Sequence, residues 1–165
     1  MTPTALRLSA GLMELGADLP ELYRVGLGQR SFEAARYWGS GLERLQREGR
    51  MVWTSLLISD RRAVGYGGND DADLVNFLSS TNCDVVVLFN EQKGDRVKVS
   101  WRARPGLDVS NLALQFGGGG HPAAAGTELP GSMADVQQQV LTATRAFLAA
   151  HEGADSPSIQ QAEVN

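Results

Sequence analysis

CDVVVLFNEQKGDRVKVSWRAR, residues 83–104, consists of two β-prone runs separated by the turn-like tripeptide Lys-Gly-Asp. The first run is continuously apolar, which is typical of a strand covered on both faces of a sheet. The second run alternates, so Val97 and Trp101 fall on one face of a strand while Lys98 and Arg102 fall on the other. The stretch therefore predicts an antiparallel hairpin whose second strand has one core face and one polar face.

Helices and one further strand are predicted before this hairpin. Residues 2–47 have helical periodicity with short breaks, and Asp18 and Ser31 stand where helix N-caps are expected. The β-prone run MVWTSLLI starts at Met51 and predicts a strand that enters the sheet. Residues 71–80, DADLVNFLSS, predict a helix with an acidic first turn.

Short elements and one long helix are predicted after the hairpin. Asp108 is the expected cap of a short helix that ends near Phe116, and Thr-Glu-Leu at 127–129 is a candidate edge strand. Ser132 is the expected cap of a long helix that reaches about Ala150. This order of elements predicts an α/β fold, in which a small mixed β-sheet with packed helices is preceded by a helical linker region.

The domain organisation follows from these elements. A chain of 165 residues is long enough for one domain with its own core. We expect a helical linker over residues 1–47, a folded domain over residues 48–150 and a disordered tail over residues 151–165, because the tail lacks hydrophobic periodicity.

The net charge, the cysteine content and the hydropathy limit which partners and which compartment are expected for this protein. The net charge of −4 and the pI near 5.1 argue against a broad basic surface that grips long nucleic acid, although a local anion site remains compatible with them. The single cysteine, Cys83, cannot form an internal disulfide, so nothing requires an oxidising compartment. No apolar run approaches the length of a membrane span, so we expect no membrane partner and a cytoplasmic protein.

A glycine run is the most specific chemical feature of the sequence. Gly117 to Gly120 stand directly before His121 and Pro122. Glycines let backbone amides turn into one concavity and bind an anion, and an imidazole beside them can add a further contact. Pro122 is expected to start a short helical turn over residues 123–125, whose first amides would face the same phosphate. The alternative is a flexible loop with a solvated histidine.

Other familiar motifs fit the sequence poorly. Gly118, Gly120 and Ala123 formally match G-x-G-x-x-A, but a helical pattern precedes them and Pro122 interrupts them, which argues against a dinucleotide fold. No Lys-Ser or Lys-Thr follows the glycines, so a Walker loop is excluded. His121 and His151 lie far apart in the sequence, and no HExxH or CxxC occurs, so we expect no metal ligands in this chain.

Two arginines and one asparagine are further candidate binding residues. Arg102 and Arg104 leave the second hairpin strand at alternate positions, and a pair of planar guanidinium groups there can clamp phosphate oxygens. Asn76, on the helix before the hairpin, is a candidate for contact with a base, while a cap on the hairpin is its structural alternative. Trp53 and Trp101 lie in strand patterns and are expected in the core rather than under a base.

Three aspartates near the start of the helix at 71–80 form an acidic cluster. Asp70, Asp71 and Asp73 are expected to cap this helix rather than to hold a metal ion.

Taken together, FGGGGHPAAAG at residues 116–126 and the preceding VKVSWRAR and DLVNFLSS closely resemble the DHH-associated domain of the DHH phosphoesterases. The resemblance extends from Leu6 to Ala149 and is strongest from Asp70 to Gly126. Within this superfamily the chain is most similar to the branch of bifunctional oligoribonucleases and 3′-phosphoadenosine 5′-phosphate (PAP) phosphatases. RecJ exonucleases, cyclic-dinucleotide phosphodiesterases and the C-terminal domain of alanyl-tRNA synthetases have related loops.

The resemblance implies a two-domain hydrolase. In that family a catalytic domain with an Asp-His-His signature holds two manganese ions that assist hydrolysis. This sequence contains no Asp-His-His, so it resembles the substrate-binding half, with residues 1–47 similar to the end of the missing catalytic domain and the linker. No cofactor is then expected in this chain, and Mn²⁺ is expected in a catalytic domain that acts in cis or in trans.

The resemblance also implies roles for individual residues. Gly118, Gly119, Gly120 and His121 would hold a phosphate, and Arg102 and Arg104 would contact the nucleotide or its phosphate. Ala103 stands where related sequences usually have serine, so a hydroxyl contact at that position is not expected.

The expected ligands are short oligoribonucleotides or mononucleotide bisphosphates. A free-standing RNA- or nucleotide-binding module without hydrolytic activity is one alternative, and a cyclic-dinucleotide phosphodiesterase domain is another. A homodimer is also compatible with the sequence, because the apolar faces of the first helices lack an evident partner.

Overall fold

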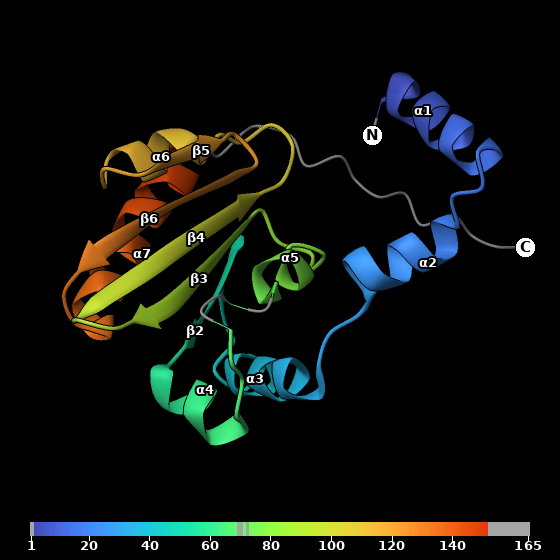
Figure 1. Ribbon diagram of the computed structural model, residues 1–165. Helices are drawn as coiled ribbons and strands as arrows, with labels where there is room; N and C mark the ends of the chain where they lie inside the picture. The colour runs from blue at the N-terminus through green and yellow to red at the C-terminus, as the bar shows by residue number, and fades with distance from the viewer. Residues whose placement is uncertain (1, 69–70, 72, 152–165) are drawn as a thin grey trace, which may run out of the picture.

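The structure is a computed structural model, and it describes residues 2–68, 71 and 73–151. The strands are β1 (Gln46–Glu48), β2 (Met51–Leu56), β3 (Val85–Gln92), β4 (Arg96–Ala103), β5 (Gly119–His121) and β6 (Ala124–Pro130). The helices are α1 (Pro3–Glu14), α2 (Leu19–Tyr23), the π-helical turn η1 (Arg24–Gly28), α3 (Phe32–Glu43), α4 (Ile58–Val64), α5 (Leu74–Leu78), α6 (Ser110–Leu114) and α7 (Met133–Ala150). Figure 1 shows α3 to α7 beside one sheet, with α1 and α2 lying away from it.

The sheet is mixed, as the sequence predicts. Its strand order is β1-β2-β3-β4-β6-β5, with β2 and β3 parallel and the other neighbours antiparallel. The hairpin at residues 83–104 is confirmed as β3 and β4, with Val85 paired to Ala103 and Gln92 paired to Arg96. Because the side chains of a strand alternate between faces, this register sends Trp101 to one face of the sheet and Arg102 to the other.

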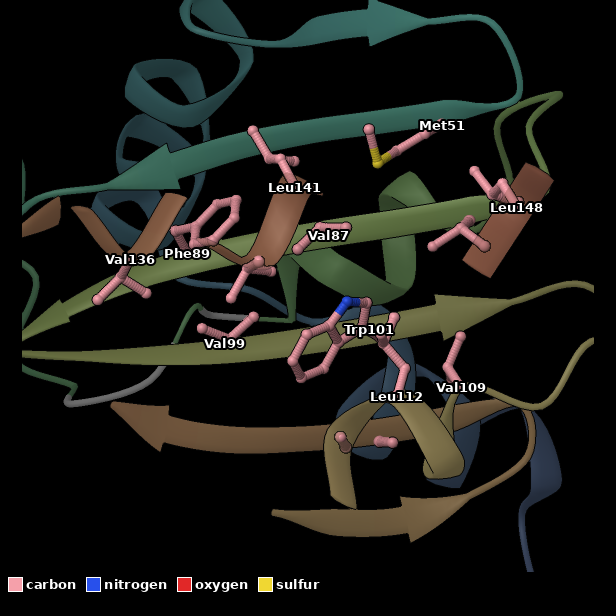
Figure 2. Packing of buried hydrophobic residues seen from close by; sticks show 14 of the residues in the cluster. Met51, Val87, Phe89, Val99, Trp101, Val109, Leu112, Val136, Leu141 and Leu148 are labelled. Carbon is pink, nitrogen blue, oxygen red and sulfur yellow. The ribbon is translucent and has the colours of Figure 1, made fainter. Parts of the chain in front are cut away.

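One face of the sheet packs against α6 and α7. Figure 2 shows Trp101, Val87 and Phe89 from the central strands meeting Leu141 of α7 in this core. Trp101 is fully buried, and its indole Nε1 donates a hydrogen bond to Thr144 Oγ1 at 3.2 Å. The expectation that Trp101 belongs to the core is confirmed, and Trp53 is packed against the same cluster.

The opposite face has a second core that covers only part of the sheet. Its buried residues come from α3, α5, β2 and β3, as with Tyr37, Leu78 and Val86, and the described residues contribute none from β4, β5 or β6. The second face of these three strands therefore extends beyond the helices that cover β2 and β3 (Figure 1).

Three of the predicted helix caps are confirmed. The side chains of Asp18, Ser31 and Ser132 accept hydrogen bonds from backbone amides in the first turns of α2, α3 and α7. Asp108, the expected cap of the short helix, accepts a hydrogen bond from the Ser110 amide at 2.9 Å, but it lies one residue before Val109, the N-cap of α6. Local side-chain chemistry thus accounts for these helix starts.

The first helices expose apolar side chains, as the sequence suggests. Leu8 and Leu12 of α1 and Leu22 of α2 are all more than half exposed. A homodimer through this surface stays a prediction. The predicted tail at residues 151–165 lies outside the described residues apart from His151.

Two sequence-based expectations about local structure are wrong. Residues 2–47 are not entirely helical, because β1 occupies Gln46–Glu48 and pairs with β2 as an edge strand without apolar periodicity. Residues 123–125 form no helical turn: Ala124 begins β6, and Ala125 packs beneath Trp101 in the strand register. The strand predicted at 127–129 is longer than expected, because β6 spans Ala124–Pro130. Its predicted edge position is confirmed for residues 127–129: they pair with β4 on one side, whereas β5 pairs with residues 124–126.

Helix α4 was not predicted, and an ion pair fixes its position. Asp60 accepts two hydrogen bonds at 2.7 Å from the Arg44 guanidinium and one at 2.9 Å from the Leu57 amide. Burial opposes ionisation of Asp60, but the Arg44 guanidinium and the Leu57 amide outweigh it and hold the pKa of Asp60 below its ordinary value. This contact joins the C-terminus of α3 to the N-terminus of α4.

Asp60→Asn is expected to lower the free energy of unfolding by about 1–2 kcal/mol at pH 7. This loss is smaller than that for a fully buried ion pair, because solvent screens the partly exposed Arg44. Because the pKa of Asp60 is lower in the folded than in the unfolded state, its ion pair stabilises the fold fully at pH values above the unfolded-state pKa. This stabilisation is lost as the pH falls through the folded-state pKa. Urea denaturation at pH 7 and at pH 3 measures the difference, which should shrink at the lower pH. Equal differences at both values would contradict the assignment to this carboxylate.

Candidate functional site

The strand register aligns Arg102 with His121. Arg102 of β4 is paired with Ala124 of β6, and Ala124 is paired with His121 of β5. Directly opposed residues of antiparallel strands project from the same face, so these three side chains form a row across the sheet. The row lies on the face opposite α7: it begins at Arg102, beside α5, and continues over β6 and β5, which contribute no described residue to the second core.

The next row on this face has almost no side chains. Ser100 of β4 is paired with Gly126 of β6, which is paired with Gly119 of β5. A Cβ built on Gly119 meets nothing within 4 Å, so its backbone borders open space. Glycines at this point leave the backbone accessible to a flat ligand that rests beside Arg102 and His121.

Two neighbouring glycines are required by the fold itself. A Cβ on Gly118 would lie 2.6 Å from Thr127 Cβ and closer still to the Gly126 carbonyl oxygen. Gly120 has φ +147°, and its Cβ would lie 2.6 Å from Ala125 Cα. The glycine run therefore serves two purposes: Gly118 and Gly120 allow the β5–β6 hairpin to close, and Gly119 keeps the open face clear.

Arg102 is oriented by its neighbours. Its Nε donates to Asn76 Oδ1 at 3.1 Å, and its Nη1 donates to its neighbouring Trp101 carbonyl at 3.0 Å. The Asn76 amide in turn lies 3.5 Å from Asp73 Oδ1, and Asp73 pairs with Arg30 at 2.5 Å. The predicted residues Asn76 and Arg102 are thus brought together directly, with Asn76 holding the guanidinium in place.

Arg104 is held by a buried carboxylate that the sequence analysis missed. Its Nε lies 2.9 Å from Asp84 Oδ1, and the other oxygen of Asp84 accepts from Arg50 Nε. Asp84 is only 7% exposed. The sole sequence signal for it was a charged residue directly before a continuously apolar strand.

Arg102 and Arg104 line one cavity of about 360 Å³, together with Ala123 and Ala124 of the β5–β6 hairpin. Cys83 and Asp84 also line it. One aspartate faces several guanidinium groups here, so the cavity retains an excess of positive charge that suits a phosphate oxygen. His121 lies on the neighbouring strand, and it is not among the residues that border this cavity.

The structure changes the predicted contribution of the backbone amides. The expected helical turn after Pro122 is absent, since the Pro122 carbonyl accepts from Val109 N–H at 2.9 Å and β6 starts two residues later. Any backbone contact to an anion must therefore come from the glycine run and not from a helix start. This follows from the non-local pairing of β6 with β4.

The acidic cluster is divided between capping and ion pairing. Asp71 accepts from the Val75 amide at 3.3 Å, whereas Asp73 pairs with Arg30. Asp70 lies outside the described residues. Within the described ranges, no three His, Cys, Asp or Glu side chains gather in a geometry that could hold a metal ion, so the residues present do not fit a manganese centre. No helix in the same ranges has the length and apolarity needed to span a bilayer.

Comparison with known proteins adds a family and a fold. The family model for the DHHA1 domain matches residues 65–150. The chain is 35% identical over 147 residues to the Bifunctional oligoribonuclease and PAP phosphatase NrnA of Thermus thermophilus, covering 87% of this chain and 44% of that protein. The chain therefore spans less than half the length of this curated relative.

A solved structure shows the same fold. An exopolyphosphatase-related protein from Bacteroides fragilis superposes with a TM-score of 0.77 at 22% identity, over 92% of this chain and 44% of that one. The resemblance inferred from the glycine run, the two arginines and the hairpin is thus confirmed at the level of the family. The chain belongs to the DHHA1 domain family.

Proposed function

We propose that this chain is the substrate-binding domain of a manganese-dependent DHH-family phosphoesterase that hydrolyses short oligoribonucleotides and 3′-phosphoadenosine 5′-phosphate. The observation that carries the proposal is the row of Arg102, Ala124 and His121 beside the glycine floor of Gly126 and Gly119. Its two polar side chains carry nitrogen donors for phosphate oxygens, and the glycine floor leaves room for a sugar or base.

The roles of the binding residues follow from their surroundings. Arg102 and Arg104 supply charge-assisted hydrogen bonds, and Asn76 and Asp84 orient their guanidinium groups. His121 is exposed at the edge strand, where it can donate to a phosphate without disturbing the core. A small number of phosphate contacts predicts a shallow dependence of affinity on salt.

Catalysis is proposed to take place on a DHH domain that carries the manganese ions. The relative from Thermus thermophilus is named for oligoribonuclease and PAP phosphatase activities, and it is more than twice as long as the matched segment. The role proposed for this chain is to bind the substrate and orient its phosphate toward that domain. Water activation and leaving-group stabilisation would be the task of the metal ions.

His121→Ala and Arg102→Ala are each expected to weaken binding of a linear diribonucleotide and of 3′-phosphoadenosine 5′-phosphate at least tenfold, because each removes a contact to a charged ligand. Isothermal titration calorimetry of the purified chain measures the affinities. Arg145→Ala is the matched control: Arg145 pairs with Glu48 at 2.7 Å on α7, on the other face of the sheet.

Three outcomes separate the alternatives. Unchanged affinity in both variants would remove the proposed site. Tighter binding of cyclic than of linear dinucleotides would favour a cyclic-dinucleotide phosphodiesterase domain. Release of mononucleotides when Mn²⁺ is added to the pure chain would contradict the assignment of hydrolysis to another domain.

A further inference from the structure

A second cavity lies on the same face of the sheet, away from the glycine run. It has a volume of about 720 Å³ and is enclosed by α4, the loop at residues 65–68 and the turn between β3 and β4. Ile58 at the start of α4 donates its amide to Glu91 Oε2 at 2.8 Å, which brings α4 against the end of β3. This end of β3 is the carboxyl end of the parallel pair β2–β3, where open α/β sheets commonly bind ligands.

The charged residues that line this cavity are mainly cationic. Arg61, Arg62 and Lys93 border it from α4 and from the β3–β4 turn. Glu128 is the acidic residue in the lining, and its carboxylate is engaged by Arg96. The cavity therefore has a positive balance in a chain whose net charge is −4.

Arg61 is held in place at the base of the cavity. Its Nη2 donates to Asn90 Oδ1 at 3.2 Å, and its guanidinium lies 5.7 Å from the centroid of the Tyr37 ring. Tyr37 is fully buried and stacks on Tyr66, which also lines the cavity. Packing of this kind fixes the arginine before a ligand arrives, which lowers the entropy lost on binding.

Two buried donors, one of this arginine and one of its partner Asn90, have no acceptor among the residues that the structure describes. They are Arg61 Nε and Asn90 Nδ2, and Asn90 is only 2% exposed. Most buried donors in folded proteins are paired, because an unpaired one loses its hydrogen bonds to water. Arg61 borders the cavity and Asn90 does not, so an acceptor oxygen from a ligand in the cavity is expected to bind the Arg61 guanidinium.

From these observations we infer that the cavity bordered by Arg61, Arg62 and Lys93 is a second binding site, whose ligand is the phosphate of a nucleotide-sized molecule. Glu128 of the cavity lining is paired in the strand register with Lys98 of β4. Lys98 lies four residues from Arg102 along β4, which is about 13 Å at the usual rise of a strand. The phosphate can belong to a free mononucleotide or to a further residue of an oligonucleotide bound at the glycine run. The inference itself does not depend on the proposed function.

The test is an NMR titration of the ¹⁵N-labelled chain with inorganic phosphate, adenosine 5′-monophosphate and a pentaribonucleotide. Changes in the amide chemical shifts report binding. Gly65, Gly67 and Gly68 line the cavity, so their amide resonances should shift on binding. The double variant Arg62→Ala/Lys93→Ala removes two exposed side chains and should bind at least tenfold more weakly. The double variant Arg7→Ala/Arg36→Ala, on α1 and α3, is the control and should bind like the wild type.

The outcomes identify the source of the phosphate. Shifts with the monophosphate or inorganic phosphate that survive His121→Ala indicate a small-molecule ligand. Shifts at these glycines with the pentaribonucleotide alone indicate an oligonucleotide backbone. Absence of shifts at these glycines with all probes, or equal affinity in both double variants, would overturn the inference, whatever happens at the glycine run.

Discussion

Gly118→Ala is expected to destabilise the fold by about 3 kcal/mol, whereas Gly119→Ala should cost less than about 1 kcal/mol and abolish ligand binding. At Gly118 an added Cβ meets the backbone of Gly126 and Thr127 Cβ at 2.6 Å, and neither can move without opening β6. At Gly119 the added Cβ meets nothing within 4 Å, so it protrudes from the face where the ligand is proposed to lie.

The pair of variants separates a structural glycine from a binding glycine. Urea denaturation measures stability, and calorimetric titration with a linear diribonucleotide measures binding. The two residues are adjacent and undergo the same chemical change, so each controls for the other. If Gly119→Ala bound as tightly as the wild type, close approach of the ligand to this backbone would be refuted.

The parts of the fold that could be predicted from sequence depend on local chemistry. The hairpin of β3 and β4 is visible because Val97 and Trp101 alternate with Lys98 and Arg102, and the side-chain period of two also indicates their faces. The caps of α2, α3 and α7 are visible because a single polar side chain satisfies nearby amides.

The parts that could not be predicted depend on pairing between distant residues. The alanines at 123–125 have helical propensity, but pairing of Ala125 with Trp101 across β6 and β4 overrides it. A glycine run carries no side-chain pattern, so β5 has no signal in the sequence. The α4 cavity is missed for the same reason, because it assembles residues from α4, the β3–β4 turn and β6.

The candidate site shows the same division. Arg102, His121 and the glycines could be selected as candidates from residue type and resemblance, and the register then places Arg102 and His121 in one row. Asn76 could also be selected, although as a contact to a base or a cap on the hairpin and not as the partner of Arg102. Asp84 could not be selected, because its role arises from contacts across the fold. Sequence thus points to the residues that carry charge, whereas the structure identifies those that position it.

Asp84→Ala is expected to lower the free energy of unfolding by about 3 kcal/mol, because it leaves the guanidinium groups of Arg50 and Arg104 without their shared carboxylate. Asp84 also joins two loops through its backbone: its N–H donates to the Arg50 carbonyl at 2.8 Å, and its carbonyl accepts from Arg104 N–H at 3.0 Å. Those backbone contacts survive the substitution, so the loss measures the side chain alone.

The companion variants distinguish a structural network from a binding residue. Arg104→Ala should cost only about 1 kcal/mol, since Arg50 still pairs with Asp84, yet it should weaken nucleotide binding at least tenfold. Removing both arginines leaves Asp84 buried without a counter-charge, so the double variant should lose more stability than the two single losses combined. Urea denaturation of the wild type, Arg50→Ala, Arg104→Ala and the double variant measures this coupling. Additive losses would show that Asp84 does not link the two arginines, and unchanged binding in Arg104→Ala would assign that residue to the fold alone.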